Sequence, residues 1–236
     1  IWWPFIRRLA QEEDIRYTGV IIETYGAQVK GPFRPLGGRA ARDGLIIYGR
    51  ELLNMGGELG LHGYNHQPLA PAGYGQPRLN YVPWESQADM EEALRELRNY
   101  VKSVYPDYDF RFYVPPSNIM SPEGKEAIRK VFPEVIAFGS LFDGPANERA
   151  YYQNFERKDG VFELPRISSG HEDDGLMLWQ EISALNYIGV FSHFIHPDEL
   201  FYETAANTTW HEMETGLKSF MHKISTRFPW LTAETI

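Results

Sequence analysis

The sequence of 236 residues contains no cysteine. This absence excludes disulfides, thiolate metal ligands and a cysteine nucleophile. No apolar run approaches the roughly 18 residues that suggest a transmembrane helix, so we expect no membrane span in this segment. Lysine and arginine form no basic stripe, and the formal net charge is −9. Nucleic acid and anionic membrane surfaces are therefore not expected as partners.

Several common catalytic fingerprints are also missing. The sequence has no GxSxG elbow, which disfavours a serine enzyme of the α/β-hydrolase class. It has no phosphate-binding P-loop and no dinucleotide fingerprint. Long Gly/Ser/Pro linkers, charge blocks and internal repeats are absent, which favours a single domain over residues 1–236. Because the chain opens on Ile1, we expect it to be an excerpt of a longer protein.

What the sequence does contain is an alternation of predicted strands and helices. Apolar runs rich in β-branched residues predict strands at residues 17–23, 58–61, 110–114, 135–138, 161–164 and 189–195. Apolar spacings of three and four predict helices at residues 2–13, 40–55, 87–104, 121–131, 174–185 and from 209 onward. Residues 142–158 are expected to be irregular. The alternation predicts an α/β fold of parallel strands with helices outside, either an open sheet or a barrel.

Two histidines, His62 and His66, follow the predicted strand at 58–61. Imidazole is the commonest protein ligand for zinc-like metals. A spacing of four places both rings on one side of a single helical turn, close enough to share an ion. The plainer interpretation is that two polar loop histidines fall four apart. The HExxH motif of zincins is excluded, because Gly63 stands where that motif needs its glutamate.

Polar residues follow three other predicted strands. A Pro-Pro-Ser-Asn segment comes after residues 110–114, Arg166 after residues 161–164, and His196 after residues 189–195. In parallel α/β folds, functional sites gather at the C-terminal ends of the strands. We therefore expect these residues and the histidine pair at one end of the fold. Two histidines alone need at least one further metal ligand, commonly a carboxylate.

Three of these segments resemble the motifs of one family. Residues 62–66 (HGYNH) resemble the HxxxH metal motif of NodB-type polysaccharide deacetylases. Residues 113–118 (YVPPSN) stand where that family carries a loop with Arg-Pro-Pro, and residues 194–198 (FIHPD) resemble its late strand that ends in a catalytic histidine. Within that family, the chain more closely resembles the deacetylase domains of Pel-type and galactosaminogalactan exopolysaccharide systems.

The resemblance implies a distorted (β/α)7-type barrel that removes acetyl groups from N-acetylhexosamine units of an exopolysaccharide. It implies an extracytoplasmic place, whether secreted, at the cell surface or periplasmic. It also implies a divalent metal, for which zinc is expected and cobalt or nickel are alternatives, held by one aspartate, His62 and His66. The metal activates a water that attacks the acetamide carbonyl, with a second aspartate as base. The residues expected to contact the N-acetylated polysaccharide are Tyr64, Pro115, Pro116, Ser117 and Asn118.

His196 is the expected acid of this reaction, because a leaving amine needs a proton donor near neutral pH. His193 is its rival. Strand alternation places His193 on the same face as Phe191 and Ile195, which resembles a face covered by helices. We therefore expect His193 to be a core or supporting residue.

The sequence departs from the family pattern at two points. The family's Asp-Asp pair ends the first strand, and here the chain begins with the helix that follows it. We therefore expect the first strand and both aspartates upstream of residue 1. Val114 also stands where the broader family has an arginine that steadies the catalytic aspartate. Arg166, from a different strand, is the expected replacement.

Two other interpretations stay open at this stage. One is a catalytically inactive, sugar-binding barrel within a polysaccharide export or modification system, which the missing aspartates support. The other is a barrel metallohydrolase of another kind, such as a glycosidase. A glycosidase needs a pair of carboxylates across a cleft, and the sequence offers no convincing pair.

Overall fold

The computed structural model describes residues 1–35, 38–74, 79–140, 142–143, 151–152, 155–158, 160–201 and 208–236. The chain forms two compact units. The sheet unit comprises Thr18–Pro165 with Ile236, and the terminal unit comprises Ile1–Tyr17 with Arg166–Thr235. The assignment of residues 1–236 to one domain stays a prediction.

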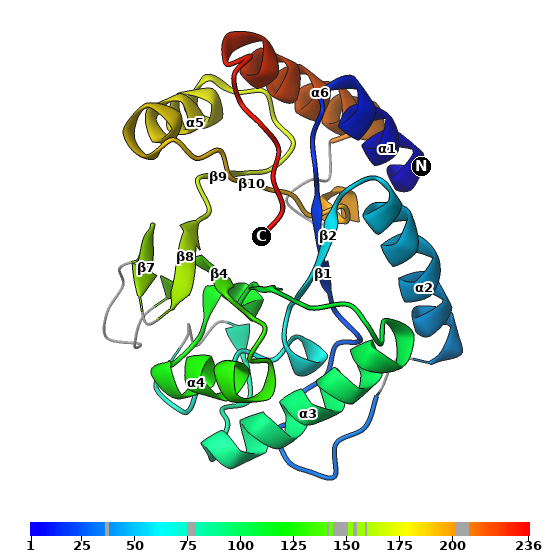
Figure 1. Cartoon of the computed structure of the whole chain (residues 1–236), viewed down its shortest axis with the longest axis vertical. Helices are drawn as coiled ribbons and strands as arrows, with labels where there is room; N and C mark the ends of the chain where they lie inside the picture. The colour runs from blue at the N-terminus through cyan, green and yellow to red at the C-terminus, as the bar shows by residue number, and fades with distance from the viewer. Residues whose placement is uncertain are drawn as a thin grey trace. The chain divides into compact units, whose positions relative to one another are not determined.

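The sheet unit is built from short strands with a helix between most successive pairs (Figure 1). Its larger elements are β1 (Thr18–Ile21), α2 (Arg39–Asn54), β2 (Glu58–Leu61), α3 (Gln87–Val104), β3 (Phe112–Tyr113), α4 (Pro122–Val131), β4 (Ala137–Ser140) and β8 (Val161–Pro165). Its smaller elements are the 3-10 turns η1 (Tyr64–His66) and η3 (Pro116–Asn118), with strands β5 (Phe142–Asp143), β6 (Tyr151–Tyr152) and β7 (Glu156–Lys158).

The strand order of the six-stranded sheet is β1-β2-β3-β4-β8-β7. The pairs from β1 to β8 are parallel, whereas β7 pairs antiparallel with β8. Successive parallel strands are thus neighbours, as in a (β/α) barrel, without the reversal of order that marks a doubly wound sheet. The described strands do not close a barrel. The predicted α/β class with a mostly parallel sheet is confirmed.

Burial explains why these segments form the sheet and its covering helices. All four residues of β2 are buried, as expected for a central strand of a parallel sheet. Along α3, Leu94, Leu97 and Val101 are fully buried. Ser86 begins this helix by accepting a hydrogen bond from the Asp89 amide, immediately before the range predicted for it. Figure 1 shows α2, α3 and α4 on the outer side of the strands.

Two predictions of local structure were wrong. Residues 142–158 are not wholly irregular, because β5, β6 and β7 lie within them. A strand of three polar residues such as β7 gives no apolar pattern from which it could be predicted. It forms because it pairs with β8. The strand expected at 189–195 is reduced to β10 (His193–Phe194), because Gly189 adopts a left-handed conformation (φ 71°) and ends the preceding helix.

The terminal unit contains three helices and one small parallel sheet among the described residues. Its elements are α1 (Trp2–Glu12), β9 (Ser168–Ser169), α5 (Gly175–Ile188), β10, the 3-10 turn η4 (Glu199–Phe201) and α6 (Trp210–Arg227). Thr209 and Glu212 form a capping box at the start of α6, the helix predicted from residue 209 onward. The Trp210 ring packs edge-on against Phe5 of α1. No helix within the described ranges has the length and apolar character needed to cross a membrane.

Candidate active site

His62 lies immediately after β2 and is held by the neighbouring strand. β2 pairs with β3 in parallel, so the backbone just beyond β3 lies beside the end of β2. The His62 Nδ1–H donates a hydrogen bond to the Val114 carbonyl oxygen, at 2.7 Å. The ring is 6% exposed. A proton on Nδ1 leaves the lone pair of the neutral ring on Nε2, the arrangement typical of metal-binding histidines.

The His66 ring lies beside the His62 ring, but the backbone between them is not the helical turn that the spacing predicts. Its ring centroid lies 4.9 Å from that of His62. The backbone between the two rings contains Gly63 (φ 79°), Asn65 (φ 51°) and His66 (φ 55°), all with positive φ. Left-handed residues other than glycine are energetically unfavourable and concentrate at functional sites. The two rings therefore meet through a constrained 3-10 turn, not through one turn of an α-helix.

A tyrosine that the sequence did not single out joins this site. The Tyr81 hydroxyl lies 3.2 Å from His66 Nδ1 and 2.6 Å from Ser117 Oγ. The Tyr25 ring lies 4.9 Å from the His66 ring, centroid to centroid. Neither tyrosine carries a sequence signal, because each stands in an irregular segment where no spacing relates it to the histidines.

The segment from Pro115 to Asn118 follows β3 and lies beside the histidine turn. Pro115 and Pro116 are buried, and a Cβ atom added to Gly63 would come within 2.9 Å of Pro116 Cγ. Ser117 (φ 48°) and Asn118 (φ 62°) are half-buried and left-handed. The prolines therefore pack in the interior beside the histidine turn, whereas Ser117 and Asn118 are partly exposed.

Tyr64 does not fit the sugar contact expected for it. The ring is fully buried, and its hydroxyl donates a hydrogen bond to the Arg34 carbonyl oxygen at 2.9 Å. The Phe33 ring packs edge-on against it. Tyr64 therefore supports the histidine turn from within the sheet unit.

A buried carboxylate, Glu23, follows β1 in the same unit. It is 4% exposed, and neither of its side-chain oxygens has a hydrogen-bond partner. Burial, together with the negative charge of Glu96, raises the pKa of Glu23 to about 8. Among the described residues, no three His, Cys, Asp or Glu side chains are grouped so as to hold a metal ion. Glu23 is thus not grouped with the histidine pair in this structure.

The residues present fit part of a metal centre. His62 and His66 supply two imidazole ligands with adjacent rings, and each ring has a hydrogen-bond partner at Nδ1. Such partners fix the tautomer and orientation of metal-binding histidines. Among the described residues, no third His, Cys, Asp or Glu side chain is grouped with this pair.

In the terminal unit, His193 is the centre of a buried hydrogen-bond chain. Its Nδ1 lies 2.7 Å from Ser168 Oγ, and Nε2 lies 2.8 Å from the Gly170 carbonyl oxygen. The Ser168 hydroxyl also contacts the carboxylate of Glu181, a fully buried residue of α5. Burial lowers the pKa of His193 to about 4 and raises the pKa of Glu181 to about 7. Both ring nitrogens of His193 are engaged, as expected for a supporting residue.

His196 differs from His193 in being exposed. Its side chain is 47% exposed, and Nδ1 lies 3.3 Å from Glu199 Oε1. The buried His171 approaches the same carboxylate, with 3.6 Å between Nε2 and Glu199 Oε2. Burial opposes ionisation of Glu199, but the bonds and charges of His196 and His171 lower its pKa overall. Neither His171 nor Glu199 is among the site residues predicted from the sequence.

Arg166 lies beside the same strand end as His196. Its guanidinium stands 4.7 Å from the centroid of the Phe194 ring, and the Phe194 ring packs edge-on against His196 at 4.5 Å. Arg166 and His196 therefore both contact the Phe194 side chain.

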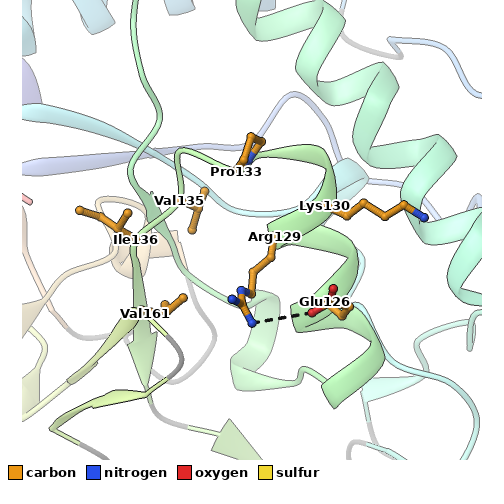
Figure 2. A pocket seen from close by; sticks show the side chains of 8 residues that line it. Glu126, Arg129, Lys130, Pro133, Val135, Ile136 and Val161 are labelled. Carbon is orange, nitrogen blue, oxygen red and sulfur yellow. Dashed lines mark ion pairs between the residues drawn. The ribbon is translucent and has the colours of Figure 1, made fainter.

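A cavity of about 390 Å³ lies elsewhere in the sheet unit (Figure 2). Val135 and Ile136 precede β4, and Val161 begins β8, so these lining residues stand at the N-terminal ends of the strands. Arg129 and Glu126 of α4 also line the cavity and form an ion pair with each other, at 3.8 Å. Functional sites of parallel α/β folds gather at the opposite, C-terminal ends. The cavity is thus separate from the histidine pair.

Comparison with solved structures identifies the fold. A putative polysaccharide deacetylase from Mycobacterium smegmatis matches with a TM-score of 0.54 and 13% identity, over 99% of this chain and 79% of that one. A CE4 family pseudoenzyme from Bacillus anthracis matches with a TM-score of 0.51 and 10% identity, over 96% of this chain and 58% of that one. A 4-alpha-glucanotransferase from Thermococcus litoralis matches with a TM-score of 0.51 and 14% identity, over 95% and 34% respectively.

At such identities these similarities show the fold alone, which is that of the CE4, or NodB-like, polysaccharide deacetylases. The chain spans little more than half the length of the Bacillus anthracis protein. No curated protein matches the sequence. A family model described as "uncharacterised protein conserved in bacteria" (DUF2194) matches residues 1–236. The chain therefore belongs to the DUF2194 family, on a fold shared with CE4 deacetylases.

Proposed function

We propose that the chain is the deacetylase domain of a metal-dependent enzyme that acts on N-acetylhexosamine units of an exopolysaccharide. The observation that carries the proposal is the pair of adjacent imidazoles, His62 and His66, each with a hydrogen-bond partner at Nδ1. The deacetylase fold of the solved neighbours supports it. The motif resemblance to Pel-type and galactosaminogalactan systems supports the choice of polymer, and with it an extracytoplasmic location.

His62 and His66 would hold the divalent metal through Nε2, and the nitrogen ligands favour zinc, with cobalt or nickel as alternatives. When bound, the metal supplies an activated water and stabilises the charge that develops on the acetamide oxygen. The hydrolysis forms a bond between the water oxygen and the carbonyl carbon and breaks the carbon–nitrogen bond, which yields acetate and a free amine. A further ligand and the general base, which the resemblance assigns to two aspartates, come from outside the described residues.

We assign protonation of the leaving amine to His196. The side chain is exposed, and its contact with the Glu199 carboxylate orients the ring. His193 is the less suitable donor, because Nδ1 and Nε2 already contact Ser168 and Gly170. Arg166 orients the same strand end through Phe194.

We assign substrate contact to Ser117 and Asn118. Both have left-handed backbones on a segment anchored by two buried prolines, so their side chains are presented at fixed positions. Hydroxyl and amide groups are suited to hydrogen bonding with sugar hydroxyl and acetamide groups.

Acetate release from a soluble N-acetylated hexosamine oligosaccharide tests the proposal. The full-length protein is first depleted of metal with a chelator and then supplied with Zn²⁺, Co²⁺ or Ni²⁺. We expect release to be absent after depletion and restored by at least one of these ions. Binding of the oligosaccharide without acetate release under any of them would support an inactive sugar-binding protein instead.

A further inference from the structure

Tyr81 connects the two segments that carry the candidate metal and substrate contacts. Its hydroxyl oxygen lies 3.2 Å from His66 Nδ1 and 2.6 Å from Ser117 Oγ. The tyrosine ring is half-buried, with its centroid 6.2 Å from that of His66. One oxygen atom therefore contacts both η1 and η3.

The number of available protons limits how these three groups can pair. The tyrosine hydroxyl has one proton to donate. If it donates to Ser117 Oγ, its lone pair accepts the proton of His66 Nδ1–H, and Nε2 of the neutral ring carries the lone pair. If it donates to His66 Nδ1 instead, the proton of the neutral ring must lie on Nε2, which then has no lone pair for a metal.

The backbone at both residues that Tyr81 contacts has an unfavourable conformation. His66 and Ser117 have left-handed φ angles of 55° and 48°, and each belongs to a turn of three residues. Such conformations persist only where surrounding contacts determine them. His62 needs no comparable side chain, because the Val114 backbone carbonyl fixes it from an adjacent strand.

We propose that Tyr81 is a positioning residue that sets the tautomer and orientation of His66 for metal binding and links that ring to Ser117. The inference rests on the proposed function, because it concerns the same metal centre. Tyr81 accepts from His66 and donates to Ser117. Loss of its hydroxyl removes the acceptor that keeps the proton of His66 on Nδ1.

Metal titration of the full-length Tyr81→Phe protein tests the inference, with Zn²⁺ affinity measured by calorimetry and Co²⁺ binding by its visible absorption. We expect a 10- to 100-fold loss of affinity, as is usual when a partner of a metal-binding histidine is removed. Tyr105→Phe is the matched control, since its hydroxyl also donates to a protein acceptor, the Leu45 carbonyl oxygen at 2.7 Å. That variant should bind metal like the wild type.

The remaining variants separate this inference from the proposed function. Ser117→Ala keeps Tyr81 but removes the acceptor of its hydroxyl proton. We expect this variant to lose metal affinity, by a smaller factor than Tyr81→Phe. His62→Ala should abolish binding in any case. One outcome would overturn the role of Tyr81 alone. In it, the wild type and Tyr81→Phe bind metal with equal affinity and His62→Ala does not bind. A wild type that binds no metal would overturn both proposals.

Discussion

The Nδ1 atom of His62 lies 2.7 Å from the carbonyl oxygen of Val114. Because a carbonyl can only accept, this contact requires a proton on Nδ1. The acceptor belongs to the backbone, so the contact does not depend on which side chain stands at position 114.

We predict that His62 is protonated at Nδ1 in the metal-free protein at neutral pH. Long-range ¹H–¹⁵N spectra of the imidazole distinguish the two neutral tautomers. Val114→Ala should leave the His62 pattern unchanged, because it retains the carbonyl. A His62 ring protonated at Nε2 alone would be incompatible with the assigned contact.

Gly63 is the residue whose backbone most constrains the histidine turn. Its φ of 79° and ψ of 167° lie in a region that only glycine adopts readily. A Cβ atom at this position would also approach Pro116 Cγ to 2.9 Å. We expect Gly63→Ala to lower the free energy of unfolding by about 1–3 kcal/mol and to weaken metal binding.

Gly44 in α2 is the matched control for that substitution. An added Cβ would meet its nearest atom, Tyr48 Cδ2, at 3.9 Å, and alanine favours the helix. Gly44→Ala should therefore stabilise the protein by about 0.5–1 kcal/mol in urea unfolding. A Gly63→Ala protein as stable as the wild type would show that the turn tolerates another backbone conformation.

The Glu181–Ser168–His193 chain predicts two opposing pH dependences. Burial raises the pKa of Glu181 from 4.5 to about 7, so its contribution to stability falls as the pH rises through that range. Burial lowers the pKa of His193 from 6.5 to about 4, so its contribution falls as the pH decreases through that range. Between pH 4.5 and 6.5 the two slopes cancel in the wild type.

Removing either group should expose the slope of the other. In Glu181→Gln the histidine remains, and stability should increase from pH 4.5 to 6.5 by on the order of 2 kcal/mol. In His193→Asn the glutamate remains, and stability should decrease over the same range. Urea midpoints at three pH values measure both. Parallel pH profiles for the two variants would rule out the opposing contributions.

Exposure of His196 predicts a catalytic effect without a structural one. His196→Ala should reduce acetate release by about 10²–10⁴-fold, the usual contribution of a general acid. Its zinc affinity and unfolding midpoint should match those of the wild type, because the side chain is half in solvent. Full activity in this variant would show that another group protonates the leaving amine.

The sequence allowed the fold class to be predicted because apolar periodicity and capping residues are local signals. Ser86, Asp174 and Thr209 begin their helices where the pattern places them. Such local signals could not predict the left-handed turn at Asn65, because it depends on contacts between segments distant in sequence. The same holds for the contacts of Tyr81, for the contact of Glu199 with His171, and for the burial of Tyr64.

The central claim is that His62 holds a metal on which deacetylation depends. Acetate release from an N-acetylated hexosamine oligosaccharide should be measured for the zinc-loaded full-length protein, for His62→Ala and for His211→Ala. His211 is an exposed histidine of α6 and serves as the control. We predict release by the wild type and by His211→Ala, with loss of release in His62→Ala. Undiminished release by His62→Ala would contradict the account.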